Sequence, residues 1–172
     1  FDTWALSRNM LRNKNFKYLD NDESKPKTLD YLSDEAENKL RFERVYTGLP
    51  VKLMLGGGIE YARYTNSTLA KVFLNGTVND INYHTQLGLF GYQAFAQVSD
   101  EYLKNRLKLS LGISTVGNNF NDNMKDPLNQ LSPRFSASYV LTDKWDLNAN
   151  FGRYAMQPAY TSLGFKNAAG EY

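Results

Sequence analysis

The most regular pattern of apolar and polar residues lies between residues 131 and 154, in two alternating segments joined by a short polar turn. One face of the first segment carries Phe135, Ala137, Tyr139 and Leu141, and the other carries Arg134, Ser136 and Ser138. In the second segment, Trp145, Leu147, Ala149 and Phe151 oppose Asp146, Asn148, Asn150 and Gly152. Alternation with a period of two is typical of β-strands. The two segments therefore predict one long β-hairpin with an apolar face and a polar face.

This alternation fits two classes of protein. In a soluble β-sandwich the polar face is the outer one, whereas in a membrane barrel the apolar face contacts lipid and the polar face lines a wet lumen. Arms of about ten residues match the span of a tilted transmembrane strand, which favours the barrel. The alternative stays open: a soluble β-sandwich or small barrel that acts as a carbohydrate- or protein-binding module.

Two further hairpins are predicted upstream, over residues 39–64 with a turn at 48–50 and over residues 87–115 with a turn at 103–105. Long polar segments at residues 9–38, 65–86 and 115–131 are predicted to be loops. Within the first of these, residues 34–38 carry a weak helix-capping signal. The pattern thus predicts an all-β fold, an antiparallel up-and-down meander of about seven strands. Short turns that alternate with long loops are typical of outer-membrane barrels.

Several segments resemble the barrel repeats of TonB-dependent outer-membrane receptors, most closely those of the Bacteroidetes type. They are Leu-Ser-Pro-Arg-Phe-Ser-Ala-Ser-Tyr at 131–139, Leu-Thr-Asp-Lys-Trp at 141–145, Asn-Phe-Gly-Arg-Tyr at 150–154 and Gln-Pro-Ala-Tyr at 157–160. The resemblance covers most of residues 39–160 and implies a fragment of the C-terminal β-barrel in the bacterial outer membrane. It implies energised uptake of a siderophore, cobalamin or glycan. The implied partners are outer-membrane lipid, the plug domain of the parent chain, the TonB complex and a small-molecule or glycan ligand.

On this interpretation, residues 1–172 form one partial barrel domain, and we expect the plug domain and the signal peptide to lie outside it. The chain begins at Phe1 without a methionine, a basic segment or an apolar leader, so we expect it to be a piece of a longer polypeptide. Such a piece has unpaired edge strands and an apolar stripe. We therefore expect it to associate with itself or to require detergent.

The composition agrees with strands that alternate between two environments. Aromatic residues make up 14% of the chain, with 12 tyrosines and 10 phenylalanines, as expected where tyrosines lie at membrane interfaces. No apolar run approaches the roughly 20 residues of a transmembrane helix. A net charge of +2 is too small to indicate nucleic-acid binding, and the absence of cysteine excludes disulfides and thiolate chemistry.

Catalytic and metal-binding signatures are weak. His84 is the only histidine and lies in a predicted loop without a second histidine or a cysteine nearby, which argues against a zinc site or a Ser-His triad. We therefore predict neither an enzyme nor a cofactor. Two sets of loop oxygens, Asp20, Asp22 and Glu23 in one and Asn119, Asn121, Asn123 and Asp126 in the other, lack the glycine of an EF-hand. Solvated loops are the favoured interpretation, and calcium binding stays open.

The polar face of the predicted barrel is the best place to look for functional contacts. The candidate lumen-facing residues are Arg106, Lys108, Arg134, Asn148, Asn150 and Tyr154. We expect them to pair mainly with neighbouring strands or with the plug, and less with a passing solute. Three consecutive glycines, Gly56 to Gly58, lie in mid-strand, where they permit sharp curvature or the close approach of another element such as a plug.

Overall fold

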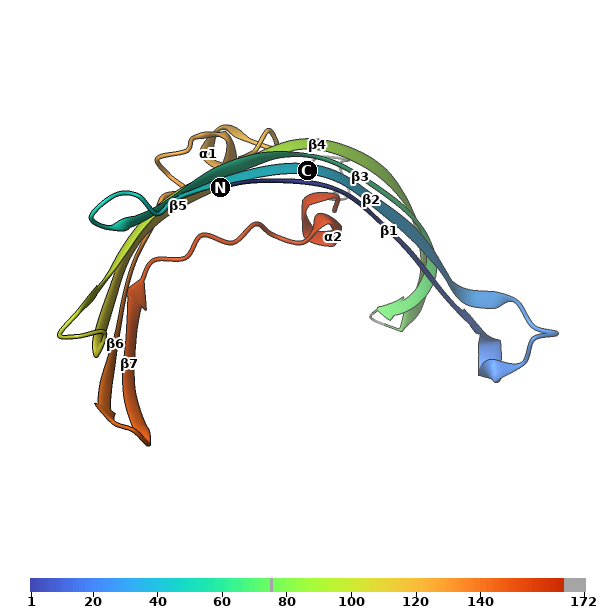
Figure 1. Ribbon diagram of the computed structural model, residues 1–172. Coiled ribbons are helices and arrows are strands. Elements are labelled where there is room, and N and C mark those ends of the chain that lie inside the picture. Colours follow the sequence, from blue (N-terminus) through green and yellow to red (C-terminus); the bar gives the residue numbers. More distant parts are fainter. Residues whose placement is uncertain (75, 166–172) are drawn as a thin grey trace. The chain divides into compact units, whose positions relative to one another are not determined.

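The computed structural model describes residues 1–74 and 76–165, and these residues form seven strands in a single antiparallel sheet (Figure 1). The strands are β1 (Asp2–Tyr18), β2 (Lys27–Tyr46), β3 (Lys52–Leu74), β4 (Thr77–Tyr102), β5 (Leu107–Asn118), β6 (Ser132–Thr142) and β7 (Trp145–Gly152). Each strand pairs with the next one along the chain. The all-β up-and-down meander predicted from the alternation is therefore confirmed.

The contacts within the chain divide it into two compact units. Unit 1 comprises Phe1–Ser7, Lys39–Glu60 and Phe90–Gln157, and unit 2 comprises Arg8–Asn38, Tyr61–Leu89 and Pro158–Tyr172. Strands β1 to β4 contribute residues to both units, whereas β5, β6 and β7 belong to unit 1 alone. The two units differ in what covers their faces, as described below.

The predicted hairpin at residues 131–154 is the β6–β7 pair (Figure 1). Phe135 lies opposite Phe151 on β7 and opposite Leu111 on β5, so one in-register row of large apolar side chains crosses three strands. Leu109, Ala137 and Ala149 form a second such row. These rows alternate with polar ones, because successive side chains of a strand point to opposite faces.

The three predicted short turns are confirmed at residues 47–51, 103–106 and 143–144. In the second of these, Leu103, Lys104 and Asn105 have φ values of 53°, 57° and 67°, the left-handed conformation that tight turns require. The loop predicted at residues 115–131 is confirmed over residues 119–131, which contain no strand and only the one-turn helix α1 (Asp122–Lys125), whereas residues 115–118 belong to β5. Asn121 begins this helix, and its side-chain oxygen accepts a hydrogen bond from the Met124 amide.

The prediction of a long loop at residues 9–38 is wrong. Both β1 and β2 run far into this segment, and only residues 19–26 connect them, with a short 3₁₀ turn (Leu19–Asn21). The expected helical turn at residues 34–38 is likewise wrong, since it lies inside β2. Polar cross-strand pairs stabilise this extension, among them the bidentate pair of Arg12 with Asp34. A strand with polar side chains on both faces lacks the apolar alternation by which strands are recognised.

The prediction of a loop at residues 65–86 is wrong for a similar reason. Strand β3 continues to Leu74 and β4 begins at Thr77, so the connection is very short. The segment contains many β-branched residues, such as Thr65, Val72 and Ile81, which favour extended backbone. His84 accordingly lies within β4 and not in a loop.

The glycines of β3 provide space for side chains of the neighbouring strand β4. A methyl group on Gly56 would lie 2.5 Å from two ring carbons of Phe95 and 2.7 Å from the carbonyl oxygen of Phe42. One on Gly58 would lie 3.0 Å from the side-chain nitrogen of Gln93. The close approach expected at these glycines is therefore made, within the described residues, by β2 and β4.

Buried apolar side chains are concentrated in unit 2. Among the described residues, the buried apolar side chains are those of Ala62, Tyr64, Leu87, Leu89 and Leu163, and all belong to unit 2. In unit 1 the large apolar side chains of β5, β6 and β7 are exposed instead: Leu111 is 58%, Leu147 60% and Phe151 82% exposed. The apolar face of unit 1 therefore remains uncovered within the described residues.

Substitution of Gly56 by alanine tests the close packing of β3 against β4. The added methyl group meets a backbone oxygen that cannot move freely, so we expect a loss of about 1–3 kcal/mol in the free energy of unfolding. Urea unfolding followed by tryptophan fluorescence measures this loss. Gly48→Ala is the matched control, because nothing lies within 4 Å of its added methyl group, and its effect should stay within about 0.5 kcal/mol. Equal unfolding midpoints for the two variants would contradict the packing described here.

Candidate functional site

The candidate site is the polar face of unit 1, built from β4, β5, β6 and β7. Cross-strand register brings its side chains into rows: Lys108 lies between Glu101 and Ser138, and Asn148 follows on β7. The next row on this face consists of Ser99, Ser110, Ser136 and Asn150. Each row is contributed by consecutive strands, so every residue is positioned by backbone pairing on both sides except at β7.

Two adjoining grooves, which we call the polar groove, follow these rows. The first has a volume of about 550 Å³, and the second, of about 490 Å³, shares Gln97, Ser110, Ser136 and Asn150 with it. The remaining polar residues of the first groove are Lys52, Ser99, Asp100, Glu101, Lys108, Ser138 and Asn148. Arg134 and Tyr154 line the second. The groove is therefore bordered mainly by hydroxyl and amide groups.

The register and the groove locate five of the six candidate residues on one face. Lys108, Asn148 and Asn150 border the first groove, and Arg134 and Tyr154 border the second. The guanidinium carbon of Arg134 lies 4.7 Å from the centre of the Tyr154 ring, a cation–π contact that fixes the direction of the arginine. The structure thus brings these five residues together along one wall.

Arg106, the sixth candidate, has a different position. Its Nη2 donates hydrogen bonds to the carbonyl oxygens of Val140 (2.9 Å) and Leu141 (2.8 Å). Its guanidinium carbon also lies 5.5 Å from the Tyr139 ring centre. The side chain binds the end of β6 beside the irregularity between Val140 and Thr142, and it does not line the polar groove.

The serines and Gln97 were absent from the sequence-derived candidates. Ser99, Ser110, Ser136 and Ser138 lie on the same face as Lys108 and Asn150, and the alternation of the strands already placed two of them there. The candidates were charged and amide side chains, and the shorter serine side chains were not among them. The serines are recognised from the register between neighbouring strands, which the sequence of a single strand does not contain.

The groove holds charged side chains among its hydroxyl and amide groups. Lys108 Nζ lies 3.0 Å from Glu101 Oε1, with the two side chains 61% and 46% exposed, so this ion pair is expected to add at most about 1 kcal/mol. Lys52, Asp100 and Arg134 also border the groove. The groove can hold a polar ligand or polypeptide segment by many hydrogen bonds, each of about 0.5–1.5 kcal/mol.

Among the described residues, no histidine borders the polar groove to serve as a base for its serines. His84 lies on β4 in unit 2 and does not border the polar groove. Within residues 1–74 and 76–165, no group of histidines and carboxylates is arranged to hold a metal ion.

The oxygen atoms considered for calcium bind the backbone instead. Asn119 Oδ1 accepts from the Phe90 amide at 2.9 Å, and Asp126 Oδ1 accepts from the Leu128 amide at 2.9 Å. In the other loop, hydrogen bonds from the hydroxyl and amide of Ser24 lower the pKa of Asp22. These contacts give each loop a structural role.

A second arrangement lies in unit 2, where residues 158–165 pack on strands β2, β3 and β4. This segment contains the one-turn helix α2 (Tyr160–Leu163). Tyr160 donates a hydrogen bond to Glu37 Oε1 at 2.8 Å, and the Tyr83 hydroxyl donates to the Gly164 carbonyl. A methyl group on Gly164 would lie 2.8 Å from the Tyr64 ring. The segment therefore covers the small apolar core of unit 2.

Burial under this segment changes the acid–base properties of its neighbours. Burial, together with the adjacent hydroxyl of Tyr31, raises the pKa of Tyr64 to about 12. Burial and then the charge of Glu37 raise the pKa of Glu35. Both shifts favour the neutral form of the side chain, which agrees with a packed structural cluster.

Comparison with protein-family models, with curated proteins and with solved structures found no match to this chain. In the part of the chain that the structure describes, no helix has the length and apolar character needed to cross a membrane. Inference about function therefore depends on the residues and on the geometry of the sheet.

Tyr160→Phe tests whether the hydrogen bond to Glu37 holds residues 158–165 in place. Loss of a bond of about 1 kcal/mol should raise the hydrogen-exchange rates of the Leu163 and Gly164 amides roughly fivefold, if exchange occurs by local opening. Tyr154→Phe is the control, because no hydrogen bond of its hydroxyl is found among the described residues. Unchanged rates in the Tyr160 variant would show that the remaining contacts hold the segment without this hydrogen bond.

Proposed function

We propose that this chain forms part of the β-barrel of a TonB-dependent outer-membrane receptor, which takes up a scarce nutrient with energy from the TonB complex. The nutrient class is a siderophore, cobalamin or a glycan. In this role the polar groove faces the lumen, where it contacts the plug domain or the passing solute. The exposed apolar side chains of β5, β6 and β7 contact lipid. The chain has no catalytic role in this proposal.

The observation that carries the proposal is that the same strands have an apolar face on one side and a polar face on the other. On one face, Leu111, Phe135 and Phe151 form an exposed apolar row. On the other, Ser110, Ser136 and Asn150 border a groove of hydroxyl and amide groups. Exposed apolar rows of this kind are costly in water, at roughly 25 cal/mol for each Å² of apolar surface. They are expected where the surrounding solvent is lipid.

Strand lengths support the same proposal. Strands β5, β6 and β7 contain 12, 11 and 8 residues, close to the roughly 9–11 residues that a tilted strand needs to cross a bilayer. We take the strand segments of unit 1 as the membrane-spanning ones. In outer-membrane barrels the short turns are periplasmic, so the turns at residues 47–51, 103–106 and 143–144 of unit 1 are assigned to that side.

A soluble carbohydrate- or protein-binding module is the alternative derived from the sequence. A β-sandwich buries the apolar face of one sheet against a second sheet. The strands of the described residues belong to one sheet, and no specific contact favours the sandwich. The substitutions below distinguish the two functions.

Leu111→Arg and Ser110→Arg are adjacent substitutions on opposite faces of β5. In a membrane barrel, an arginine on the lipid face near the bilayer centre costs about 2–4 kcal/mol, so Leu111→Arg should prevent stable insertion. Ser110→Arg should insert normally, because its side chain enters a wet groove. The yield of the heat-modifiable folded form, measured by electrophoresis after refolding into phosphatidylcholine vesicles, gives the comparison. Equal yields for the two variants would argue for the soluble module.

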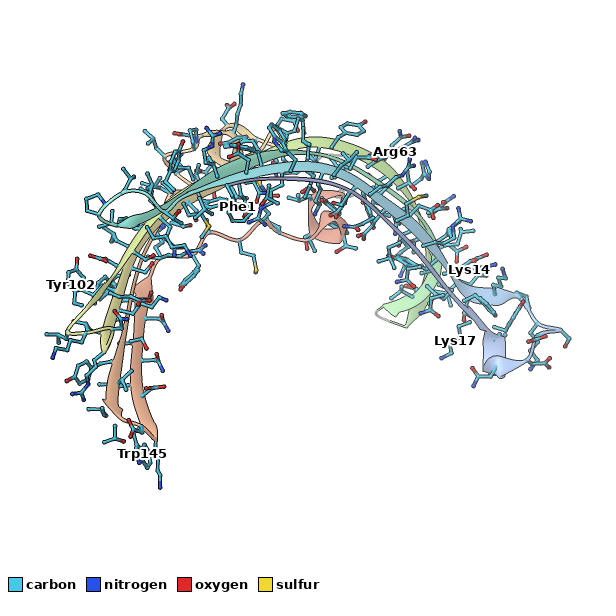
Figure 2. All side chains as sticks on the ribbon, in the orientation of Figure 1. Phe1, Lys14, Lys17, Arg63, Tyr102 and Trp145 are labelled. Atoms are coloured by element: carbon cyan, nitrogen blue, oxygen red, sulfur yellow. The ribbon has the colours of Figure 1, made fainter. Side chains whose placement is uncertain are left out.

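Fractionation of source-cell membranes tests the location directly. An antibody to residues 131–154 should detect a band much heavier than the 19.6 kDa of this chain, confined to the outer membrane and shifted by heating. A soluble species of 19.6 kDa would contradict the receptor proposal and favour the binding module. Trp145, which is 70% exposed beside the β6–β7 turn (Figure 2), gives a second readout. Quenchers located in the bilayer should reduce its fluorescence.

A further inference from the structure

Residues 158–165, which we call the strap, cover a face of unit 2 that is only partly apolar. Tyr64 of β3 lies under the strap, since a methyl group on Gly164 would be 2.8 Å from its ring. Asn66 follows two residues later on the same strand and therefore on the same face. The buried polar side chains of unit 2 are 4%, 4% and 2% exposed, and they are Ser33, Asn66 and Thr85. The strap thus lies on hydroxyl and amide groups as well as on apolar ones.

The Thr85 hydroxyl is buried without a hydrogen-bond partner among the described residues. Thr85 follows Tyr83 by two residues on β4, and Tyr83 bonds the strap through the Gly164 carbonyl, so Thr85 shares the covered face. A buried hydroxyl without a partner raises the free energy of the covered state, because the same group is hydrogen-bonded in water. Release of the strap allows water to reach this hydroxyl and removes the penalty.

The strap is joined to the sheet through side chains. Tyr160 donates to a carboxylate oxygen of Glu37, and Tyr83 donates to the carbonyl of Gly164. Within the described residues, the backbone hydrogen bonds of the strap run inside the strap itself, from the amides of residues 162–164 to the carbonyls of Ala159 and Tyr160. Its release therefore breaks no backbone pairing between strands. Local opening of this kind needs less free energy than separation of the strands.

One apolar contact favours the covered state of the strap. Leu163 is 6% exposed and is the buried apolar side chain that the strap contributes. Burial of one leucine and burial of one unpaired hydroxyl, such as that of Thr85, are energy terms of similar size and opposite sign. Terms of this kind bring a covered state and an open state close in free energy.

We propose that the strap is a releasable cover, which opens to expose the polar groups beneath it while strands β2, β3 and β4 stay paired. In the open state Ser33, Asn66 and Thr85 form a surface of hydroxyl and amide groups that water or a polar ligand can reach. In the covered state the strap occupies that surface. The inference concerns unit 2 alone and goes beyond the proposed function, because it applies to a membrane barrel and to a soluble module alike.

Thiol labelling at residue 85 tests the opening. The chain contains no cysteine, so Thr85→Cys introduces a single thiol, and it removes no hydrogen bond found among the described residues. In the folded full chain, a maleimide should label this thiol much faster than the chain unfolds, as measured by tryptophan fluorescence on the same sample. Adding Leu163→Ala should accelerate the labelling at least about 30-fold, because it removes the apolar anchor of the strap.

Ser110→Cys is the control for the labelling experiment. Ser110 borders the polar groove of unit 1, so its thiol should react rapidly and at a rate that Leu163→Ala leaves unchanged. Labelling at residue 85 that is no faster than unfolding overturns the releasable strap. Labelling at residue 85 that Leu163→Ala does not accelerate also overturns it, because the strap then does not control access to Thr85.

Thr85→Val tests whether the unpaired hydroxyl favours release. Valine has nearly the same shape without the hydroxyl, so the covered state should gain stability and the Leu163 and Gly164 amides should exchange hydrogen about tenfold more slowly. The amides of β3 and β4 should exchange at unchanged rates. Thr65→Val is the matched control, since Thr65 lies between Tyr64 and Asn66 and therefore on the opposite face of β3. Unchanged exchange of the strap amides in Thr85→Val overturns the proposal, because the covered state then has no penalty that release removes.

Discussion

The antiparallel register of β5, β6 and β7 is the constraint on which both faces of unit 1 depend. Leu111, Phe135 and Phe151 meet in one row, and Ser110, Ser136 and Asn150 meet in the next. A slip of one residue in either pairing would move apolar side chains into the polar groove and serines onto the apolar face. The two-residue turn at 143–144 limits this slip between β6 and β7. Arg106 adds to the same constraint, since its guanidinium binds the carbonyl groups where β6 becomes irregular.

The two units bury apolar surface in different ways. In unit 2, residues 158–165 return to the sheet and cover Tyr64, and Leu163 of this segment is itself buried. In unit 1 the described residues include no such cover, and the large apolar side chains stay exposed. Exposure of such an apolar face to water is unfavourable in free energy. The environment of unit 1 therefore has to supply the missing apolar surface, and lipid is the solvent that the proposed function provides.

The polar groove offers hydroxyl and amide groups together with charged side chains, of which Lys108 is compensated by Glu101. It therefore favours polar partners that form many weak hydrogen bonds. Backbone pairing fixes this surface, since it lies on strands held from both sides over most of its width. Rigid strands position such groups more accurately than mobile loops do.

The alternation of residues 131–154 determined the β6–β7 hairpin and its two faces, and the same pattern in the upstream hairpins determined the meander of seven strands, because a strand with one apolar face shows a period of two in its sequence. It failed at residues 9–38 and 65–86, where long strands carry polar side chains on both faces and are held by cross-strand pairs such as Arg12 with Asp34. Of the candidate residues, Lys108, Arg134, Asn148, Asn150 and Tyr154 could be selected from the strand alternation and polarity, whereas Arg106 turned to the backbone of β6. The serine rows and the cover over Tyr64 were decided by tertiary structure alone. Each depends on which strand lies next to which, and pairing between distant segments is a property of the folded sheet and not of any single segment.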